Sequence, residues 1–294
     1  MYIHKKTAGD WAFDIINTLL MLVLVFVTLY PMYYVLCASV SDNTYLVAHP
    51  GVLFRPHGLT FGAYRMTFEH PLILSGYRNI LLVLLLSLPL NIIMTLFCGY
   101  FMAAKKMLLK KYIVVFMMFT MFFSGGLIPA YLNQRSLGLY NNIWALVIPG
   151  ALSLYNAIIC KTAIEAIPEG LTESAYIDGA NDVIILFRIV APLIMPTMAV
   201  LLLYYGVGHW NDWFTASIYI TDNNLLPIQN VLRALLIANT DVLGSGESVG
   251  DQYDSYAETI KYAAIIVTTV PVLCIYPFLQ KYFVKGVMIG AVKG

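Results

Sequence analysis

The chain has 294 residues, of which 60% are hydrophobic and 11% are charged, and its formal net charge is +1. Soluble domains carry about 25% charged residues, so this composition excludes a single large soluble core and predicts an all-α polytopic membrane protein. The small net charge gives no basis, from bulk charge, for a nucleic-acid partner or for recognition of acidic substrates.

Six apolar stretches are long enough to cross a bilayer, which takes about 20 helical residues. The first is too long for a cleaved signal peptide and is expected to be retained. In chain order we expect spans at Phe13–Ala38, Tyr77–Ala104, Tyr112–Leu132, Ile143–Ile164, Ile184–Tyr205 and Glu258–Phe283. Together they form one transmembrane domain over residues 1–294.

Basic residues indicate how these spans are oriented. The loop after the second span carries four lysines, and the amino-terminal segment and the tail carry further lysines, whereas the opposite side carries mainly arginines that are diluted by acidic residues. Positive charge favours the cytoplasmic side, so we expect both termini in the cytoplasm. Ser41–Pro71 and the longest polar stretch, 221–257, are then external, with short helices near Phe61–Phe68 and from Pro227.

The polar residues within the spans indicate no catalytic chemistry. Asn91 and Pro89 lie inside the second span and should face protein, because hydrocarbon satisfies neither an amide nor a freed carbonyl. His209 is expected to be a hydrogen-bonded interfacial residue. No metal-ligand spacing, nucleophile–base pair or phosphate-binding loop is present. The four cysteines all lie in apolar runs and are expected to be buried, inert thiols: Cys37, Cys98, Cys160 and Cys274.

A polar corner interrupts the apolar pattern between the fourth and fifth spans. Glu173 opens a short helical segment, and Gly179 suits the position past a helix end, where φ is often positive. Asn181 can cap the next helix, with Asp182 in its first turn. The sequence therefore predicts a helix, a sharp turn and a second helix, with the segment 165–183 exposed on the cytoplasmic side. An amphipathic loop with ordinary capping residues is the simpler alternative.

The string Glu173, Ala175, Gly179, Ile189, Pro192 resembles the "EAA" signature of permease subunits of binding-protein-dependent ABC importers. The resemblance implies a type I importer fold with six transmembrane helices and a coupling helix that docks on a cytoplasmic ATPase. Ser174 departs from the usual alanine and is small enough to preserve docking. The residues that this resemblance assigns to ATPase coupling are Glu173, Ser174, Ala175, Asp178, Gly179 and Ala180.

Three further strings resemble a carbohydrate-uptake branch that includes permeases for aldouronate and other plant-wall fragments. They begin at Ser124 (SGGLIPAYL), Trp210 (WNDWF) and Pro277 (PFLQKYFVKGVMIGAVKG). The branch implies hinge candidates Gly125, Gly126 and Pro129, although these glycines also suit close helix packing. It implies substrate-pathway candidates Tyr131, Asn133, Trp210, Asn211, Asp212 and Trp213, although the two tryptophans also suit interface anchors.

The resemblance implies a subunit of a bacterial plasma-membrane importer that takes up oligosaccharides. Its expected partners are a second permease, two ATPases that hold the ATP and Mg, a solute-binding lipoprotein and lipid, with no nucleic acid and no cofactor or metal on this chain. An ion-coupled secondary transporter is the alternative, but charges are scarce at the span centres where such carriers need them. A membrane scaffold or sensor is a third hypothesis.

Overall fold

The computed structural model describes residues 8–105, 107–245 and 257–291. Every regular element in these ranges is helical, as the composition predicts. The chain divides into two compact units. Unit 1 comprises residues 1–70 and 234–269, and unit 2 comprises residues 71–233 and 270–294, so that α14 (Ile228–Ser245) and α16 (Ala257–Ala291) each contribute to both.

Unit 1 contains α1 (Ala8–Ser39), α2 (Asn43–Ala48) and α3 (Gly62–Glu69). The Asn43 side-chain oxygen accepts hydrogen bonds from the backbone N–H groups of Glu258 (3.0 Å) and Thr259 (3.3 Å), which fixes the start of α16 against α2. Ala63, Ile260 and Ala263 form a small buried cluster beside this contact. The short helix expected near Phe61–Phe68 is therefore present, as α3.

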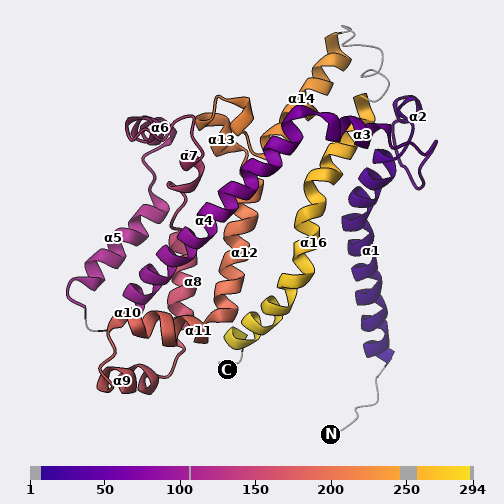
Figure 1. The fold of residues 1–294 in the computed structure, drawn as a ribbon. Coiled ribbons are helices and arrows are strands. Elements are labelled where there is room, and N and C mark those ends of the chain that lie inside the picture. The colour runs from indigo at the N-terminus through magenta and orange to yellow at the C-terminus, as the bar shows by residue number, and fades with distance from the viewer. Residues whose placement is uncertain (1–7, 106, 246–256, 292–294) are drawn as a thin grey trace. The chain divides into compact units, whose positions relative to one another are not determined.

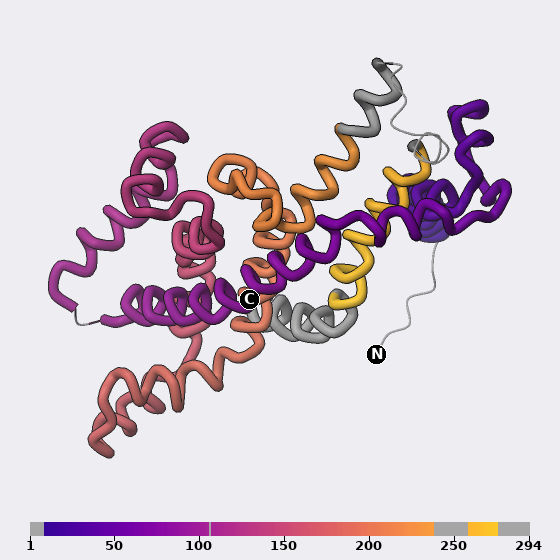
Figure 2. Tube along the Cα trace, turned by 45° about the horizontal axis from the view of Figure 1, so that its top comes forward, coloured from indigo at the N-terminus to yellow at the C-terminus, as the bar shows by residue number. Residues whose placement is uncertain are grey.

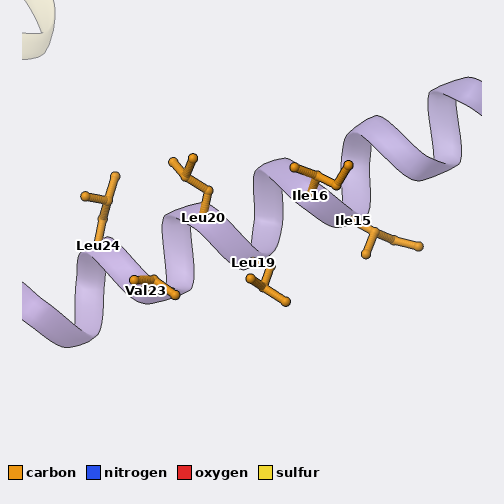
Figure 3. A pocket seen from close by; sticks show the side chains of 6 residues that line it. All are labelled: Ile15, Ile16, Leu19, Leu20, Val23 and Leu24. Atoms are coloured by element: carbon orange, nitrogen blue, oxygen red, sulfur yellow. The ribbon is translucent and has the colours of Figure 1, made fainter.

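Helix α1 has an unusually exposed apolar surface. None of its most hydrophobic 18-residue window is buried within the chain, and the hollow in Figure 3 is lined only by side chains of α1 itself. An apolar helix that its own chain leaves uncovered needs lipid or another subunit around it. The hollow therefore reflects a membrane-facing surface and has no polar group with which to bind a solute.

Unit 2 is built on α4 (Pro71–Ala103), which packs on α8 (Leu154–Glu165) and α12 (Met195–Asn211). Figures 1 and 2 show α9 and α10 at one end of this unit and α6 and α13 at the other. Its remaining elements are α5 (Lys110–Phe122), α6 (Leu127–Ser136), α7 (Trp144–Val147), α9 (Glu169–Ile177), α10 (Asp182–Ile185), a π-helical turn η1 (Leu186–Val190), α11 (Ala191–Leu193), α13 (Phe214–Tyr219) and a 3-10 turn η2 (Asn223–Leu225).

Three of the predicted spans are not single straight helices. The third bends by 112° between Phe122 and Leu127, and the fifth bends by 85° between Leu193 and Met195. The fourth is interrupted over residues 148–153, between α7 and α8. Three helices of the described residues are long and apolar enough to cross a membrane, or five if each bent pair is one span. The count of six spans and the placement of the termini therefore stay predictions.

The glycines at the third-span bend differ from those in α4. Gly126 has φ +89°, and an added Cβ at Gly125 or Gly126 would meet only Pro129, at 4.0 Å, so helix packing within the chain does not require these glycines. At Gly99 an added Cβ would lie 2.8 Å from the Cys160 sulfur and 3.2 Å from the Lys161 backbone nitrogen. Helices α4 and α8 can therefore approach this closely only because Gly99 has no side chain.

We expect Gly99→Ala to destabilise the protein by about 1–3 kcal/mol, because the crowded atoms include backbone that cannot rotate away. Gly208→Ala is the matched control, since its Cβ would meet nothing within 4 Å in the same kind of helix. That variant should be neutral or slightly stabilising, because alanine is the better helix former. Thermal unfolding in detergent compares the two, and equal shifts would contradict the close-approach argument.

Three of the four cysteines are buried, as expected, and the fourth is not. Cys37, Cys98 and Cys160 lie in apolar clusters, whereas Cys274 is exposed on α16. Its neighbours Leu273 and Ile275 are also about half exposed, at 50% and 51%. An apolar sequence run alone does not show which face of a span the protein covers, and here the burial expectation for Cys274 is wrong.

Candidate functional site: the coupling corner and the outer end of unit 2

The predicted coupling residues form a tight corner between α9 and α10. The N–H of Ala180 donates to the carbonyl of Ala175 (2.9 Å), and the N–H of Gly179 donates to that of Tyr176 (3.0 Å). This pair of bonds defines a Schellman cap, and Gly179 has the positive φ that the cap requires, +81°. Asn181 then caps α10 by accepting from the Ile184 N–H at 2.9 Å. The helix–turn–helix prediction and both capping assignments are confirmed, but the first helix begins at Glu169 and not at Glu173, which lies in its middle.

Ala175 attaches the corner to the rest of unit 2. Its side chain is buried in an apolar cluster of this unit that also contains Leu96 of α4, Ile164 of α8 and Ile185 of α10, and Ala180 packs against the same cluster. Ala175 therefore joins α9 to the apolar cluster that α4, α8 and α10 share.

Two hydrogen bonds to Asp182, which we call the latch, reinforce the apolar contact. The hydroxyl of Tyr176 donates to Asp182 Oδ1 at 2.5 Å, and the hydroxyl of Tyr100, at the end of α4, donates to the same oxygen at 3.0 Å. The hydrogen bond to Asp182 raises the pKa of Tyr176, so the phenol stays protonated and the latch stays intact at neutral pH. Lys105 adds an exposed ion pair with Glu169 at the start of α9.

The face of α9 opposite Ala175 is exposed. Residues four apart share a helix face, and Glu173 and Ile177 project together on this side; Ile177 is 87% exposed. Glu173 is in none of the salt bridges formed among the described residues. Asp178, Gly179 and Ser174 are also exposed at this end of the helix. The corner therefore presents the Glu173 carboxylate beside the apolar Ile177 side chain, with Asp178 close by at the end of the helix.

Replacement of Gly179 should loosen this corner without crowding it. A Cβ at Gly179 or at Gly170 would meet no atom within 4 Å, but only Gly179 has positive φ. We expect Gly179→Ala to cost about 1–2 kcal/mol of local stability from backbone strain, and Gly170→Ala to be neutral or slightly favourable in a helix. Hydrogen exchange of the peptide spanning residues 169–182 measures the difference. Equal protection in both variants would contradict a φ-dependent corner.

The substrate-pathway candidates lie at the opposite end of unit 2, in different environments. Trp210 is buried, 6.4 Å from the Tyr77 ring, and Asp212 accepts a hydrogen bond from the Thr215 N–H (3.1 Å) at the start of α13. Asn211 is exposed, and Trp213 is 39% exposed with Arg233 over its ring. One oxygen of the Asp212 carboxylate is thus already used locally, and all four residues stay predicted candidates for solute contact.

Tyr131 and Asn133, on α6, belong to the same end of the unit. The Tyr131 ring stacks on Tyr219 of α13 (5.9 Å between centroids) and meets Tyr140 edge-on (6.1 Å). Asn133 is exposed. Contacts with α13 therefore connect Tyr131 to the segment that carries Trp213.

A polar network between these two ends was only partly foreseen. Asn91 donates to the Gly150 carbonyl (2.7 Å), and its oxygen lies 3.0 Å from His209 Nε2. The Tyr205 hydroxyl accepts from the Ser153 N–H (2.9 Å) and lies 2.7 Å from the Thr95 hydroxyl. Both pairs satisfy backbone groups that the break between α7 and α8 leaves without helical partners. The expected hydrogen bonding of Asn91 and His209 is confirmed, whereas Tyr205 and Thr95 were missed.

Metal chemistry finds no support in the described part of the chain. No group of three or more His, Cys, Asp or Glu side chains there could hold a metal ion. The candidate site consists of the α9–α10 corner, the polar network around Asn91 and Tyr205, and the aromatic residues at the end of unit 2 that carries α6 and α13.

Comparison with known proteins agrees with this arrangement. Residues 1–289 match the family model described as "Binding-protein-dependent transport system inner membrane component". The chain belongs to this family. Its members are permease subunits of ABC importers and not enzymes.

Two relatives from Bacillus subtilis (strain 168) cover nearly the whole chain. The polygalacturonan/rhamnogalacturonan transport system permease protein YtcP is 35% identical over 282 residues, covering 96% of this chain and 98% of its own length. Protein LplC is 34% identical over 291 residues, covering 99% and 98%. The permease resemblance found in the sequence therefore extends to curated relatives of matching length.

A solved structure gives the same architecture. The chain resembles a bacterial ABC transporter involved in the import of the acidic polysaccharide alginate, with a TM-score of 0.86 and 27% identity over 95% of this chain and 99% of that one. This similarity supports a type I permease fold.

Proposed function

We propose that this chain is one transmembrane permease of an ATP-driven importer for oligosaccharides, in particular plant-wall or similar complex glycan fragments. The observation that carries the proposal is the α9–α10 corner, whose exposed Glu173 and Ile177 lie opposite the buried Ala175. Relatives named for polygalacturonan, rhamnogalacturonan and alginate transport support the substrate class.

In this proposal the membrane topology has six spans with both termini in the cytoplasm. The third and fifth spans are then the bent pairs α5–α6 and α10–α12, and the fourth is the broken pair α7–α8. Broken helices are tolerated at membrane depth where protein or a water-filled cavity satisfies the backbone, and the network around Gly150 and Ser153 does this. The corner then lies in the cytoplasm, within reach of an ATPase.

The proposed mechanism follows from how α9 is attached. When the ATPase pair closes, it displaces α9, and the contacts of Ala175 and Asp182 carry α10 and the ends of α4 and α8 with it. The 85° bend at Ile194 gives α12 a joint about which to tilt. ATP and Mg stay on the ATPases, and a second permease completes the pathway. A solute-binding lipoprotein delivers sugar at the end that carries α6 and α13.

Reconstitution separates this proposal from its rivals. The chain, its second permease, the ATPases and the binding protein are placed in liposomes, and uptake of a labelled oligogalacturonide is measured with and without ATP. Uptake that needs ATP and survives ionophores is expected. Uptake by this chain alone, driven by an ion gradient and indifferent to ATP, would establish the secondary transporter. Intact assembly with ATP hydrolysis but no sugar flux would favour the scaffold.

A further inference from the structure

An arginine and a tryptophan form a preassembled pair at the end of unit 2 that carries α6 and α13. The guanidinium carbon of Arg233, on α14, lies 3.9 Å from the centroid of the Trp213 ring. A guanidinium stacked on a ring keeps its N–H edge available for hydrogen bonds in its own plane. Arg233 is exposed and is in none of the salt bridges formed among the described residues.

The pair is held rigidly on both sides. The Trp213 carbonyl accepts hydrogen bonds from Asn230 Nδ2 (2.9 Å) and from the Ser217 hydroxyl (2.8 Å). Asn230 lies three residues before Arg233, so one helical turn of α14 fixes both partners. At the start of α14, Ile228 and Val231 pack against Gly76, where an added Cβ would come within 3.1 Å of the Ile228 Cα.

A second connection fixes the approach to α14. The buried Asn79 amide of α4 donates to the carbonyls of Asn224 (2.7 Å) and Leu226 (3.1 Å), in the segment that leads into this helix. An arginine whose ring partner and helix are both preordered loses less side-chain entropy when it binds an anion. The geometry is that of a prepared anion contact and differs from that of a loose surface arginine.

Two buried polar atoms nearby along the chain lack partners. Asn230 Oδ1 and Trp210 Nε1, in residues that are 7% and 5% exposed, form no hydrogen bond with the described residues. A buried polar group without a partner is unfavourable. One of these atoms is an acceptor and the other a donor, and both are enclosed by the surrounding side chains, so the contact that a solute can reach is the exposed Arg233. Arg233 adds paired N–H donors that match the two oxygens of a carboxylate, a group that neutral sugars lack.

We propose that Arg233, stacked on Trp213, forms a subsite for the carboxylate of a uronic acid unit in an oligosaccharide that passes through the permease. This inference rests on the proposed function and adds a preference for acidic over neutral sugars. Trp213 then acts by orienting the guanidinium with one ring face, and its remaining exposed surface contacts the sugar ring. Docking of acidic side chains of the binding protein on Arg233 is the alternative that the experiment has to exclude.

The experiment uses one sugar in two charge states. An oligogalacturonide and its full methyl ester have the same length and linkages, but only the former carries carboxylates. Both are titrated onto the purified permease–ATPase assembly without the binding protein, so that neither the selectivity nor the docking of that protein enters. The variants are Arg233→Gln, Arg233→Lys and, as the control, Arg65→Gln, which removes an arginine that is already paired with Glu69 at 2.8 Å.

Arg233→Gln should weaken binding of the acidic sugar by about 10- to 100-fold, the range expected for one charge-assisted contact, and leave binding of the ester unchanged. Arg233→Lys should fall between, because lysine keeps the charge without the planar fork. Arg65→Gln should change neither. Equal losses for both sugars, no loss, or no binding of the acidic sugar by the unchanged assembly would each overturn the subsite.

These outcomes are distinct from failure of the proposed function. ATP-dependent uptake of the oligogalacturonide by the full assembly, together with charge-independent binding, would leave the importer intact and remove the subsite. If Arg233→Gln weakens only the affinity of the binding protein for the liposomes, the arginine belongs to that docking surface and the sugar subsite is wrong. Absence of any ATP-dependent uptake would remove the importer itself.

Discussion

Glu173→Lys should abolish sugar-stimulated ATP hydrolysis in the reconstituted importer while the permease stays folded. Glu173 is exposed on α9, opposite the buried Ala175, and forms no salt bridge with the described residues. Charge reversal therefore breaks nothing inside this chain. In the proposed complex it places a cation where the ATPase groove receives a carboxylate, and repulsion at a buried interface costs several kcal/mol.

The matched control is Glu69→Lys, the same reversal at an exposed glutamate of α3. That variant loses only an exposed i,i+4 pair with Arg65, which contributes less than about 0.5 kcal/mol. Both variants should keep the thermal unfolding midpoint of the unchanged chain, and only Glu173→Lys should lose stimulation by sugar and copurification with the ATPase. Normal stimulation in Glu173→Lys would refute the assignment of α9 as the coupling helix.

The same corner shows which parts of the structure the sequence could predict. Gly179 and Asn181 have strong local preferences, for positive φ and for helix capping, that hold in almost any surroundings. The turn was therefore predictable from the identity of residues that are adjacent in the sequence. The latch from Tyr176 and Tyr100 to Asp182 was not, because the bond from Tyr100 to Asp182 joins residues that are 82 positions apart along the chain and depends on how α4 packs on the corner.

Hydropathy located the apolar stretches but not their bends. The third span turns where Gly125 and Gly126 stand, so the interruption was visible in the sequence, whereas the 85° bend of the fifth falls at Ile194, between two prolines in an otherwise apolar run. The close contacts at Gly76 and Gly99 were missed for a related reason. A glycine within a helix has no sequence signal that tells a close approach from an ordinary position, and only the neighbouring helix decides.

The end of unit 2 that carries α6 and α13 shows what a sequence motif alone cannot predict. The string from Trp210 to Trp213 identified an aromatic segment, but its four residues have four different environments: a buried ring, an exposed amide, a helix-capping carboxylate and a ring covered by Arg233. Arg233 itself attracted no attention in the sequence, although it is the single arginine of the polar stretch 221–257. Its significance depends on the ring that it covers, 20 residues earlier in the chain.

Asn91→Leu should destabilise the protein by about 1–2 kcal/mol. Asn91 is fully buried and makes hydrogen bonds with two partners, the Gly150 carbonyl and His209. Leucine has the same number and branching of side-chain heavy atoms and is more apolar, so the change leaves no cavity and loses no hydrophobic contact. The cost comes from leaving the carbonyl at the α7–α8 break and the histidine ring unpaired. Asn133→Leu, at an exposed asparagine, is the control and should leave stability unchanged.

The double variant Asn91→Leu/His209→Leu identifies the source of that cost. If unpaired groups cause it, removing both members of the Asn91–His209 pair should cost less than the sum of the single changes, because only the Gly150 carbonyl then stays without a partner. Thermal unfolding of the four proteins in detergent gives the coupling free energy. Additive losses would mean that Asn91 and His209 act independently, and the network could then not join α4 and α12 across the break in the way that the proposed movement of α12 requires.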